Sequence, residues 1–86
     1  MNIRESMEQR ELELLEKELD ALPDRLAALE EEQHRLEEAL ADPDFFSRDP
    51  SAFNAAASRM TELDDEQMMA LTRWENIEAR LAELKE

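Results

Sequence analysis

The sequence has no glycine and no cysteine among its 86 residues, and it has a single histidine. Glycine provides the positive φ angles of phosphate-binding loops, dinucleotide-binding turns and calcium loops, so its absence excludes all three. The absence of cysteine excludes disulfides, thiol catalysis and cysteine-based zinc sites. His34 alone does not provide a catalytic constellation. We therefore expect no catalytic residue, no metal ion and no cofactor in this chain.

Long apolar runs are also missing, so we expect no membrane-spanning segment. The first residues, Met1–Glu5, lack the apolar core of a signal peptide, which favours a cytoplasmic location. Positive charge is scarce as well, since 10 basic residues face 24 acidic ones and give a net charge of −14. Such a field repels DNA and RNA at long range, because nucleic-acid affinity comes mainly from cations that contact phosphates.

The apolar residues that are present follow a regular 3-4 spacing typical of coiled coils. Two seams with this spacing are separated by a break that contains Pro43 and Pro50. The first seam consists of Leu12, Leu15, Leu19, Leu22, Leu26, Leu29, Gln33, Leu36 and Leu40. The second consists of Phe53, Ala56, Met60, Leu63, Gln67, Ala70, Trp74, Ile77, Leu81 and Leu84.

The break predicts that the two seams fold back on each other. Proline does not continue a helix, and Asp49-Pro50 is typical of a helix start. An antiparallel register that places Leu40 opposite Ala56 also places Leu12 opposite Leu84, and every layer then joins an a position to a d position. The fold class is therefore all-α, a single-domain antiparallel two-helix coiled-coil hairpin over residues 1–86. We expect helix 1 over about 3–41 with a kink at 22–23 near Pro23, a turn at 42–51 and helix 2 over about 51–85.

Three polar or bulky seam residues need a separate interpretation. Gln33 and Gln67 either fix the register as buried polar residues or lie half solvated at the rim of a narrow seam. Trp74 is expected to fill the core, in the space that the kink at Pro23 opens. The sequence Glu31-x-x-His34 has the spacing found in di-iron bundles, but a second copy is missing, so we expect His34 on a solvated helix face.

Some apolar residues lie off the seams. Phe45 and Phe46 either plug the hairpin tip or contact a partner, and Met68 and Met69 are either scattered surface residues or partner contacts. We keep these four as candidate partner contacts.

The segment Ala41–Pro50, with its Asp-Pro-Asp-Phe-Phe core, resembles the turn in the C-terminal coiled-coil domain of Uup-type ABC-F ATPases. Other matching elements are Glu8–Glu13, Leu22-Pro23, the leucine heptads and Arg73-Trp74-Glu75. In that family the start motif runs almost directly into Leu-Pro, whereas residues 14–21 intervene here. Alternatively Lys17–Pro23 is the matching stretch, which would make Glu8–Glu13 part of a helical extension.

The resemblance implies a parent ATPase with two upstream ATP-binding cassettes that acts in translation at the ribosome or on branched DNA. We expect this chain to be a non-catalytic interaction arm whose partner is a protein or the ribosome, with no membrane contact. The family is associated with DNA binding, which makes direct nucleic-acid binding the first alternative. Its candidate contacts are Arg48, Arg59, Arg73 and Arg80. The second alternative is a self-associating structural coiled coil.

Overall fold

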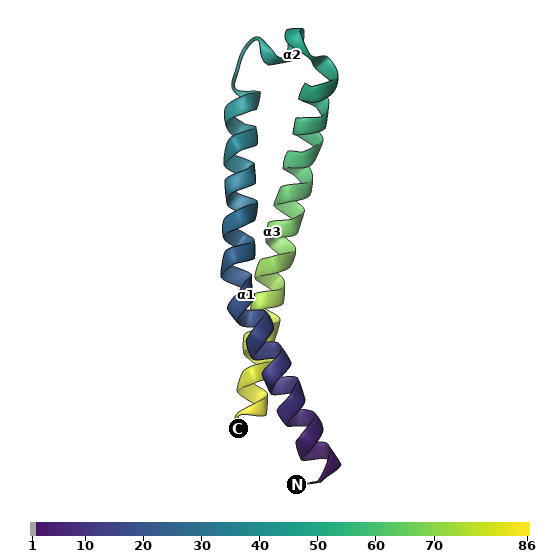
Figure 1. Cartoon of the computed structure of the whole chain (residues 1–86), viewed down its shortest axis with the longest axis vertical. Coiled ribbons are helices and arrows are strands. Elements are labelled where there is room, and N and C mark those ends of the chain that lie inside the picture. The colour runs from purple at the N-terminus through teal and green to yellow at the C-terminus, as the bar shows by residue number, and fades with distance from the viewer. Residues whose placement is uncertain (1) are drawn as a thin grey trace.

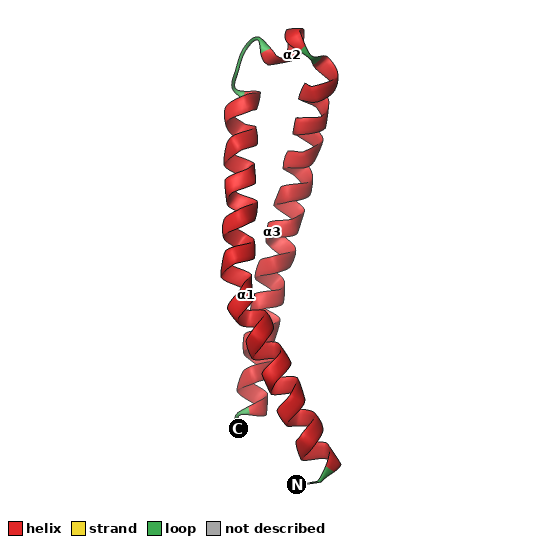
Figure 2. Cartoon of the chain, viewed as in Figure 1, coloured by secondary structure: helices red, strands yellow, loops and turns green. Residues whose placement is uncertain are grey.

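The structure, a computed structural model, describes residues 2–86 and consists of two long helices joined by a short one. Helix α1 spans Ile3–Leu40, α2 spans Phe45–Arg48 and α3 spans Pro50–Leu84. Helices α1 and α3 lie side by side in opposite directions, with α2 at the far end from both termini (Figure 1). Residues 2–86 contain no strand (Figure 2), and the molecule is a rod of 66 × 16 × 15 Å. The predicted all-helical antiparallel hairpin is confirmed.

Local capping explains where both long helices begin. The Asn2 side chain accepts a hydrogen bond from the Glu5 backbone N–H at 2.8 Å, while the Glu5 carboxylate accepts one from the Asn2 N–H at 3.4 Å. This reciprocal pair is a capping box. At the start of α3, the Asp49 side chain accepts from the Ala52 N–H at 3.0 Å, and Pro50 occupies the first helical position.

Helix α1 continues through Pro23 instead of ending there. Proline has no N–H to donate to the carbonyl four residues earlier, which bends a helix without necessarily breaking it. Figure 1 shows α1 changing direction between its purple N-terminal part and its blue middle part. The bend carries the N-terminal part of α1 across α3 in this view.

The core is confined to the two seams. All of the buried residues, which are apolar, occupy a or d positions. Leu63 and Ile77 are fully buried, and the seam leucines outside the buried set lie partly exposed at the rim of the core. The buried set is Leu22, Leu29, Ala56, Leu63, Ala70, Ile77 and Leu81.

The polar seam residues Gln33 and Gln67 pair with each other across the hairpin. The Gln67 side-chain amide donates to Gln33 Oε1 at 2.8 Å, and the Gln33 amide donates to Asp64 at 3.1 Å. Both glutamines are partly buried. Since a register shift would place each amide among leucines and leave it without a partner, this pair favours the observed register.

Trp74 lies at the rim of the core. It is partly buried and packs against the cluster that contains Leu22, Ala70 and Ile77. Its indole N–H donates to the Glu78 carboxylate one turn further along α3. The ring therefore contributes apolar contact on one side and a polar interaction with an exposed residue on the other, as amphipathic aromatic side chains commonly do.

The predicted turn at 42–51 contains the short helix α2, which was not expected from the sequence. The Asp42 side chain accepts from the Asp44 backbone N–H at 2.9 Å and pairs with Arg48 at 3.3 Å. Asp42 thus satisfies the backbone at the start of the turn and fixes the end of α2. These contacts give a physical role to the Asp-Pro-Asp-Phe-Phe segment.

Truncation of Ile77 tests the seam as the main source of stability. We expect Ile77→Ala to lower the free energy of unfolding by about 2–5 kcal/mol, because it removes a fully buried side chain. The control is Leu71→Ala, since Leu71 is 48% exposed on the same helix and its loss should change stability by less than about 0.5 kcal/mol. Urea unfolding followed by circular dichroism measures both, and equal effects would contradict this account of the core.

Candidate interaction surfaces

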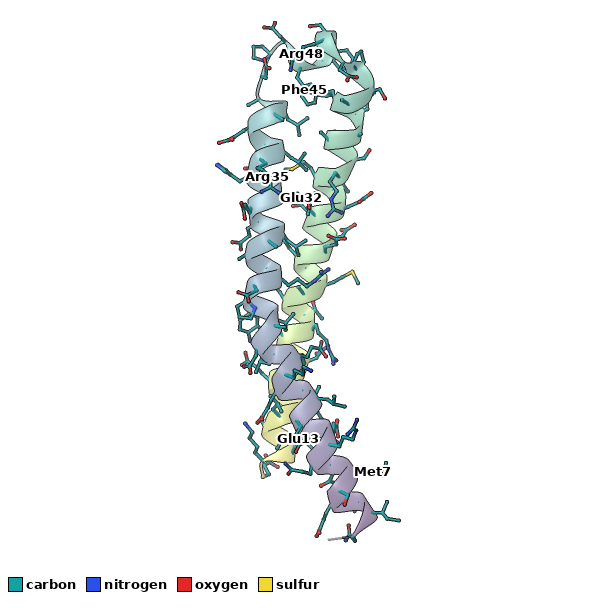
Figure 3. The ribbon with its side chains drawn as sticks, viewed as in Figure 1. Met7, Glu13, Glu32, Arg35, Phe45 and Arg48 are labelled. Atoms are coloured by element: carbon teal, nitrogen blue, oxygen red, sulfur yellow. The ribbon has the colours of Figure 1, made fainter. Side chains whose placement is uncertain are left out.

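The tip of the hairpin is closed by three phenylalanines. The rings of Phe45 and Phe46 both pack edge-on against Phe53 of α3, with centroids 5.5 and 5.3 Å apart. The guanidinium of Arg48 lies 5.8 Å from the centre of the Phe45 ring. Phe45, at the tip of the hairpin (Figure 3), is partly buried, whereas Phe46 is 53% exposed and presents the larger apolar surface.

The four candidate nucleic-acid contacts all bind carboxylates of the hairpin. Arg59 contacts three of them: Glu32 of α1 at 2.6 Å, Glu62 at 3.0 Å and Glu66 at 3.3 Å. Figure 3 shows Glu32 on the side of α1 that faces α3. Because its guanidinium already binds these carboxylates, Arg59 has few hydrogen-bond donors available for a phosphate.

The remaining three arginines are paired in the same manner. Arg73 forms a two-pronged contact with Glu18 at 2.6 and 2.8 Å, and Arg80 forms one with Glu11 at 2.8 Å for both bonds. Arg48 binds Asp42 at 3.3 Å. Two-pronged arginine–carboxylate contacts are geometrically specific as well as attractive.

These contacts shift the pKa of the groups involved. Hydrogen bonds from Arg80, Arg73 and Arg59 hold the carboxyl pKa of Glu11, Glu18 and Glu32, respectively, below the ordinary glutamate value. For Asp42 the largest cause of a lowered pKa is the backbone N–H of Asp44, followed by Arg48. All of these carboxylates favour the charged form more than a free side chain does.

Three of the cross-helix ion pairs lie on one edge of the seam, at the g positions that directly precede each a position. We call this the g edge; it comprises Glu11, Glu18, Arg25 and Glu32 of α1 with Arg80, Arg73, Glu66 and Arg59 of α3. Each of these residues of α1 lies opposite a residue of opposite charge on α3. Moving seven residues forward along α1 corresponds to moving seven residues back along α3. Three of these four opposite pairs form ion pairs, so a single register runs the length of the hairpin.

Sequence reasoning identified Arg59, Arg73 and Arg80 of the g edge, but neither Arg25 nor the carboxylates that bind the other three. Once the seams are assigned, the g positions alone predict Glu11–Arg80, Glu18–Arg73 and Glu32–Arg59 as neighbours. The signal was therefore present in the sequence. It was missed because only apolar positions were compared between the helices.

The opposite edge of the seam, at the e positions, is largely acidic. We call it the e edge; it comprises Glu16, Pro23, Glu30 and Glu37 of α1 with Lys85, Glu78, Leu71 and Asp64 of α3. Lys85 binds Glu16 at 3.3 Å and is the one cation on this edge. The remaining carboxylates of this edge are exposed, so the e edge is a negatively charged surface.

The off-seam apolar residues remain exposed. Met68 and Met69 are 65% and 71% exposed on the outer side of α3. Ile3, Met7 and Leu14 are 80%, 67% and 56% exposed on α1, and Figure 3 shows Met7 near the N-terminal end of that helix. Exposed apolar side chains that gather in this way are typical of contact surfaces.

His34 lies on an exposed helix face, with its ring 3.1 Å from the Glu38 carboxylate. Among the ion pairs of residues 2–86, none joins His34 to Glu31, which pairs with Arg35. In the part of the chain that the structure describes, no group of three or more side chains is arranged to hold a metal ion. The same residues include no helix that is long and apolar enough to cross a membrane.

The family comparison matches residues 15–79 to the ABC transporter C-terminal domain. The chain belongs to this family. No curated protein and no solved structure gave a match.

The matched range bears on how the chain aligns with its family. The match begins at Leu15, so Glu8–Glu13 lies outside it, whereas Lys17–Pro23 lies inside. This favours the second of the two alignments derived from the sequence. The first dozen or so residues of α1 are then a helical extension that precedes the family domain, and this extension carries Ile3 and Met7.

The ion pair between Glu18 and Arg73 predicts a pH-dependent stability. At pH 7 we expect Arg73→Gln to lower the melting temperature more than Arg35→Gln does. Arg35 pairs only with Glu31 on its own helix, and both substitutions change the net charge equally. A carboxyl whose pKa is lowered by folding stabilises the fold above its unfolded pKa, and this contribution is lost as the pH falls through the folded pKa. The difference between the two variants should therefore shrink on acidification below the ordinary glutamate pKa of 4.5. Thermal melts at several pH values measure it, and a difference that is constant with pH would contradict the assignment.

Proposed function

We propose that the hairpin is a non-catalytic arm through which an ABC-F ATPase contacts a protein partner, with the ribosome as its setting. Family membership supports the link to an ATP-binding cassette protein. The rod shape suits an element that reaches from a parent protein to a distant contact.

One observation carries the choice between an arm for protein contact and a nucleic-acid-binding module. Arg48, Arg59, Arg73 and Arg80 each bind at least one carboxylate of the hairpin. Phosphate binding would require breaking these contacts and would leave their carboxylates next to the nucleic-acid backbone. The acidic e edge, in contrast, attracts a basic protein surface and speeds the encounter with it.

Direct nucleic-acid binding remains the second candidate because of one specific feature. Arg10, Lys17 and Arg25 of α1 have no ion pair with any residue of 2–86. Three cations spread over two heptads provide few phosphate contacts in a chain of net charge −14.

Co-sedimentation with ribosomes and a mobility-shift assay with duplex and branched DNA separate the two candidates. We expect the chain to co-sediment with ribosomes, more strongly at low salt, and to leave the DNA unshifted even at low salt. Replacement of Glu30, Glu37 and Glu78 on the e edge by glutamine should reduce co-sedimentation.

The matched control carries Glu13→Gln, Asp20→Asn and Asp24→Asn, which remove the same charge from the outer face of α1. We expect the control to bind ribosomes as the wild type does. A DNA shift at low salt with no ribosome binding would favour the nucleic-acid candidate instead.

A further inference from the structure

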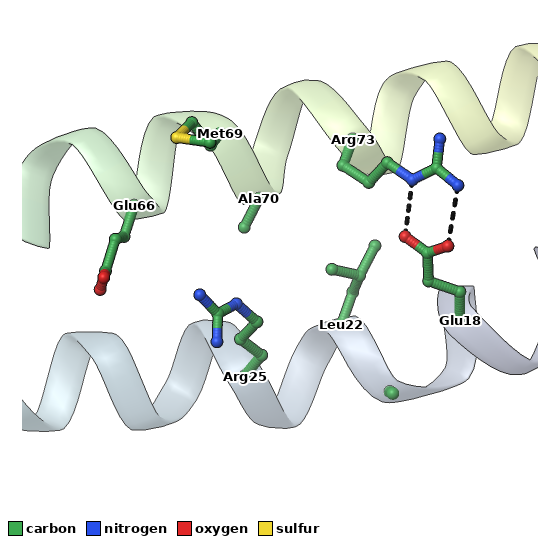
Figure 4. Close-up of a pocket in the computed structure, with 8 residues that line it drawn as sticks. Glu18, Leu22, Arg25, Glu66, Met69, Ala70 and Arg73 are labelled. Atoms are coloured by element: carbon green, nitrogen blue, oxygen red, sulfur yellow. Dashed lines mark hydrogen bonds and ion pairs between the residues drawn. The ribbon is translucent and has the colours of Figure 1, made fainter.

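A groove with an apolar floor runs along the g edge and continues onto the N-terminal part of α1. It consists of three adjoining hollows, and neighbouring hollows share lining residues. The hollows near Ile3 and near Leu14 share Met7 and Glu11, and the hollow near Leu14 shares Glu18 and Arg73 with the one over Leu22. The last of these has a volume of about 530 Å³ (Figure 4). Together they follow α1 from Ile3 to Arg25, which at 1.5 Å per residue is roughly 33 Å.

The floor of this groove consists of apolar side chains that no other part of the described chain covers. Ile3, Met7 and Leu14 supply it on α1, and Met69 supplies it on α3, each more than half exposed. The small side chains of Ala21 and Ala70 deepen the hollow over Leu22. A groove of this length and composition fits an apolar helical stripe better than a small ligand.

Arginines and glutamates line the groove in equal number, four of each. Glu11, Glu18 and Glu66 bind Arg80, Arg73 and Arg59, and Arg4 binds Glu8. Arg10 and Arg25 line the groove and have no ion pair with any residue of 2–86. The lining is therefore neutral as a whole, and Arg10 and Arg25 are its two cations without an ion pair, on a chain whose net charge is −14.

The state of Arg25 follows from competition for one carboxylate. The g-edge pattern places Arg25 opposite Glu66, but Glu66 binds Arg59 at 3.3 Å instead. Figure 4 shows the guanidinium of Arg25 extending from α1 into the space between the helices, beside Leu22 and below Met69. Arg25 thus has donors available at the rim of an apolar hollow, where a carboxylate would bind it with a planar two-pronged geometry.

We propose that this groove docks an amphipathic helix of a partner protein, whose apolar stripe covers the floor and whose carboxylates bind Arg10 and Arg25. Arg10 and Arg25 are 15 residues apart on α1, which corresponds to about 22 Å along the axis. The two carboxylates of the partner helix are spaced accordingly, about 15 residues apart. The docked helix completes a three-helix arrangement with α1 and α3. This inference rests on the proposed function as an interaction arm and assigns it a second surface, on the opposite edge from the acidic one.

Salt decides whether local or overall charge governs this contact. At about 0.15 M ionic strength the screening length is about 8 Å, so charges on the far side of the rod have little effect in the groove. Within that length, the guanidinium groups of Arg10 and Arg25 attract carboxylates of the partner helix that lie beside them.

Two synthetic helical peptides test the proposal. Each has about 24 residues, enough to span the groove, with leucines at a and d positions. One carries glutamates about 15 residues apart beside the leucine stripe, and the other carries lysines at the same positions. Fluorescence anisotropy at about 0.15 M salt should show the full chain binding the glutamate peptide more tightly.

Charge-reversal variants identify the groove as the binding surface. Arg10→Glu and Arg25→Glu should each lower the affinity for the glutamate peptide by about threefold to tenfold and raise the affinity for the lysine peptide. Leu14→Ala should weaken both peptides while preserving the helix. The matched control is Arg35→Glu, which changes the net charge by the same amount but lies outside the groove, so the preference should be unchanged.

Three results would overturn the proposal. The first is tighter wild-type binding of the lysine peptide, and the second is an equal response of Arg25→Glu and Arg35→Glu. The third is a wild-type dimer in sedimentation that Arg10→Glu and Arg25→Glu dissociate, which would assign the groove to a second copy of the chain. None of these results affects the ribosome assay, which changes only the e edge and the outer face. Failure of the groove and failure of the arm are therefore distinguishable.

Discussion

The antiparallel contact between two leucine seams is the interaction on which everything else in this molecule depends. Only seven of residues 2–86 are buried, because a rod two helices thick has no interior beyond the line where its helices meet. Every other feature is placed by that line. The g edge and the e edge flank the seam on either side. The phenylalanine tip closes one end of it, and the groove follows the g edge.

Polar residues give this seam its register. An antiparallel leucine seam alone tolerates a slip by one heptad, since leucine meets leucine again after seven residues. The Gln33–Gln67 pair and the ordered charges of the g edge remove that degeneracy, because a slip separates the glutamines and places Glu11 opposite Arg73 while Arg80 loses its partner. Hydrophobic contact thus supplies most of the stability, and polar contact selects one alignment.

The fold could be predicted from the sequence because its rules are local and repetitive. Heptad spacing gave both seams, and Pro43 and Pro50 gave the break between them. The helix α2 and the Asp42–Arg48 contact were not predicted, since a four-residue helical turn has no periodicity to read. The candidate interaction surfaces were harder to predict than the fold. The sequence showed that Phe45, Phe46, Met68 and Met69 lie off the seams. It did not show that Arg25 lacks an ion pair, because that depends on Glu66 binding Arg59 instead, and residue spacing does not reveal which arginine Glu66 binds.

The bend in α1 near Pro23 has a mechanical consequence. Both termini lie at one end of a narrow rod 66 Å long, and the phenylalanine tip lies at the other. Because the tip is the part of the rod farthest from the bend, a given change in the angle at Pro23 would displace the tip more than it displaces residues beside the bend. Pro23 removes one backbone hydrogen bond of α1 at the bend, whereas α3 has a proline only at its first position and continues past the bend without interruption.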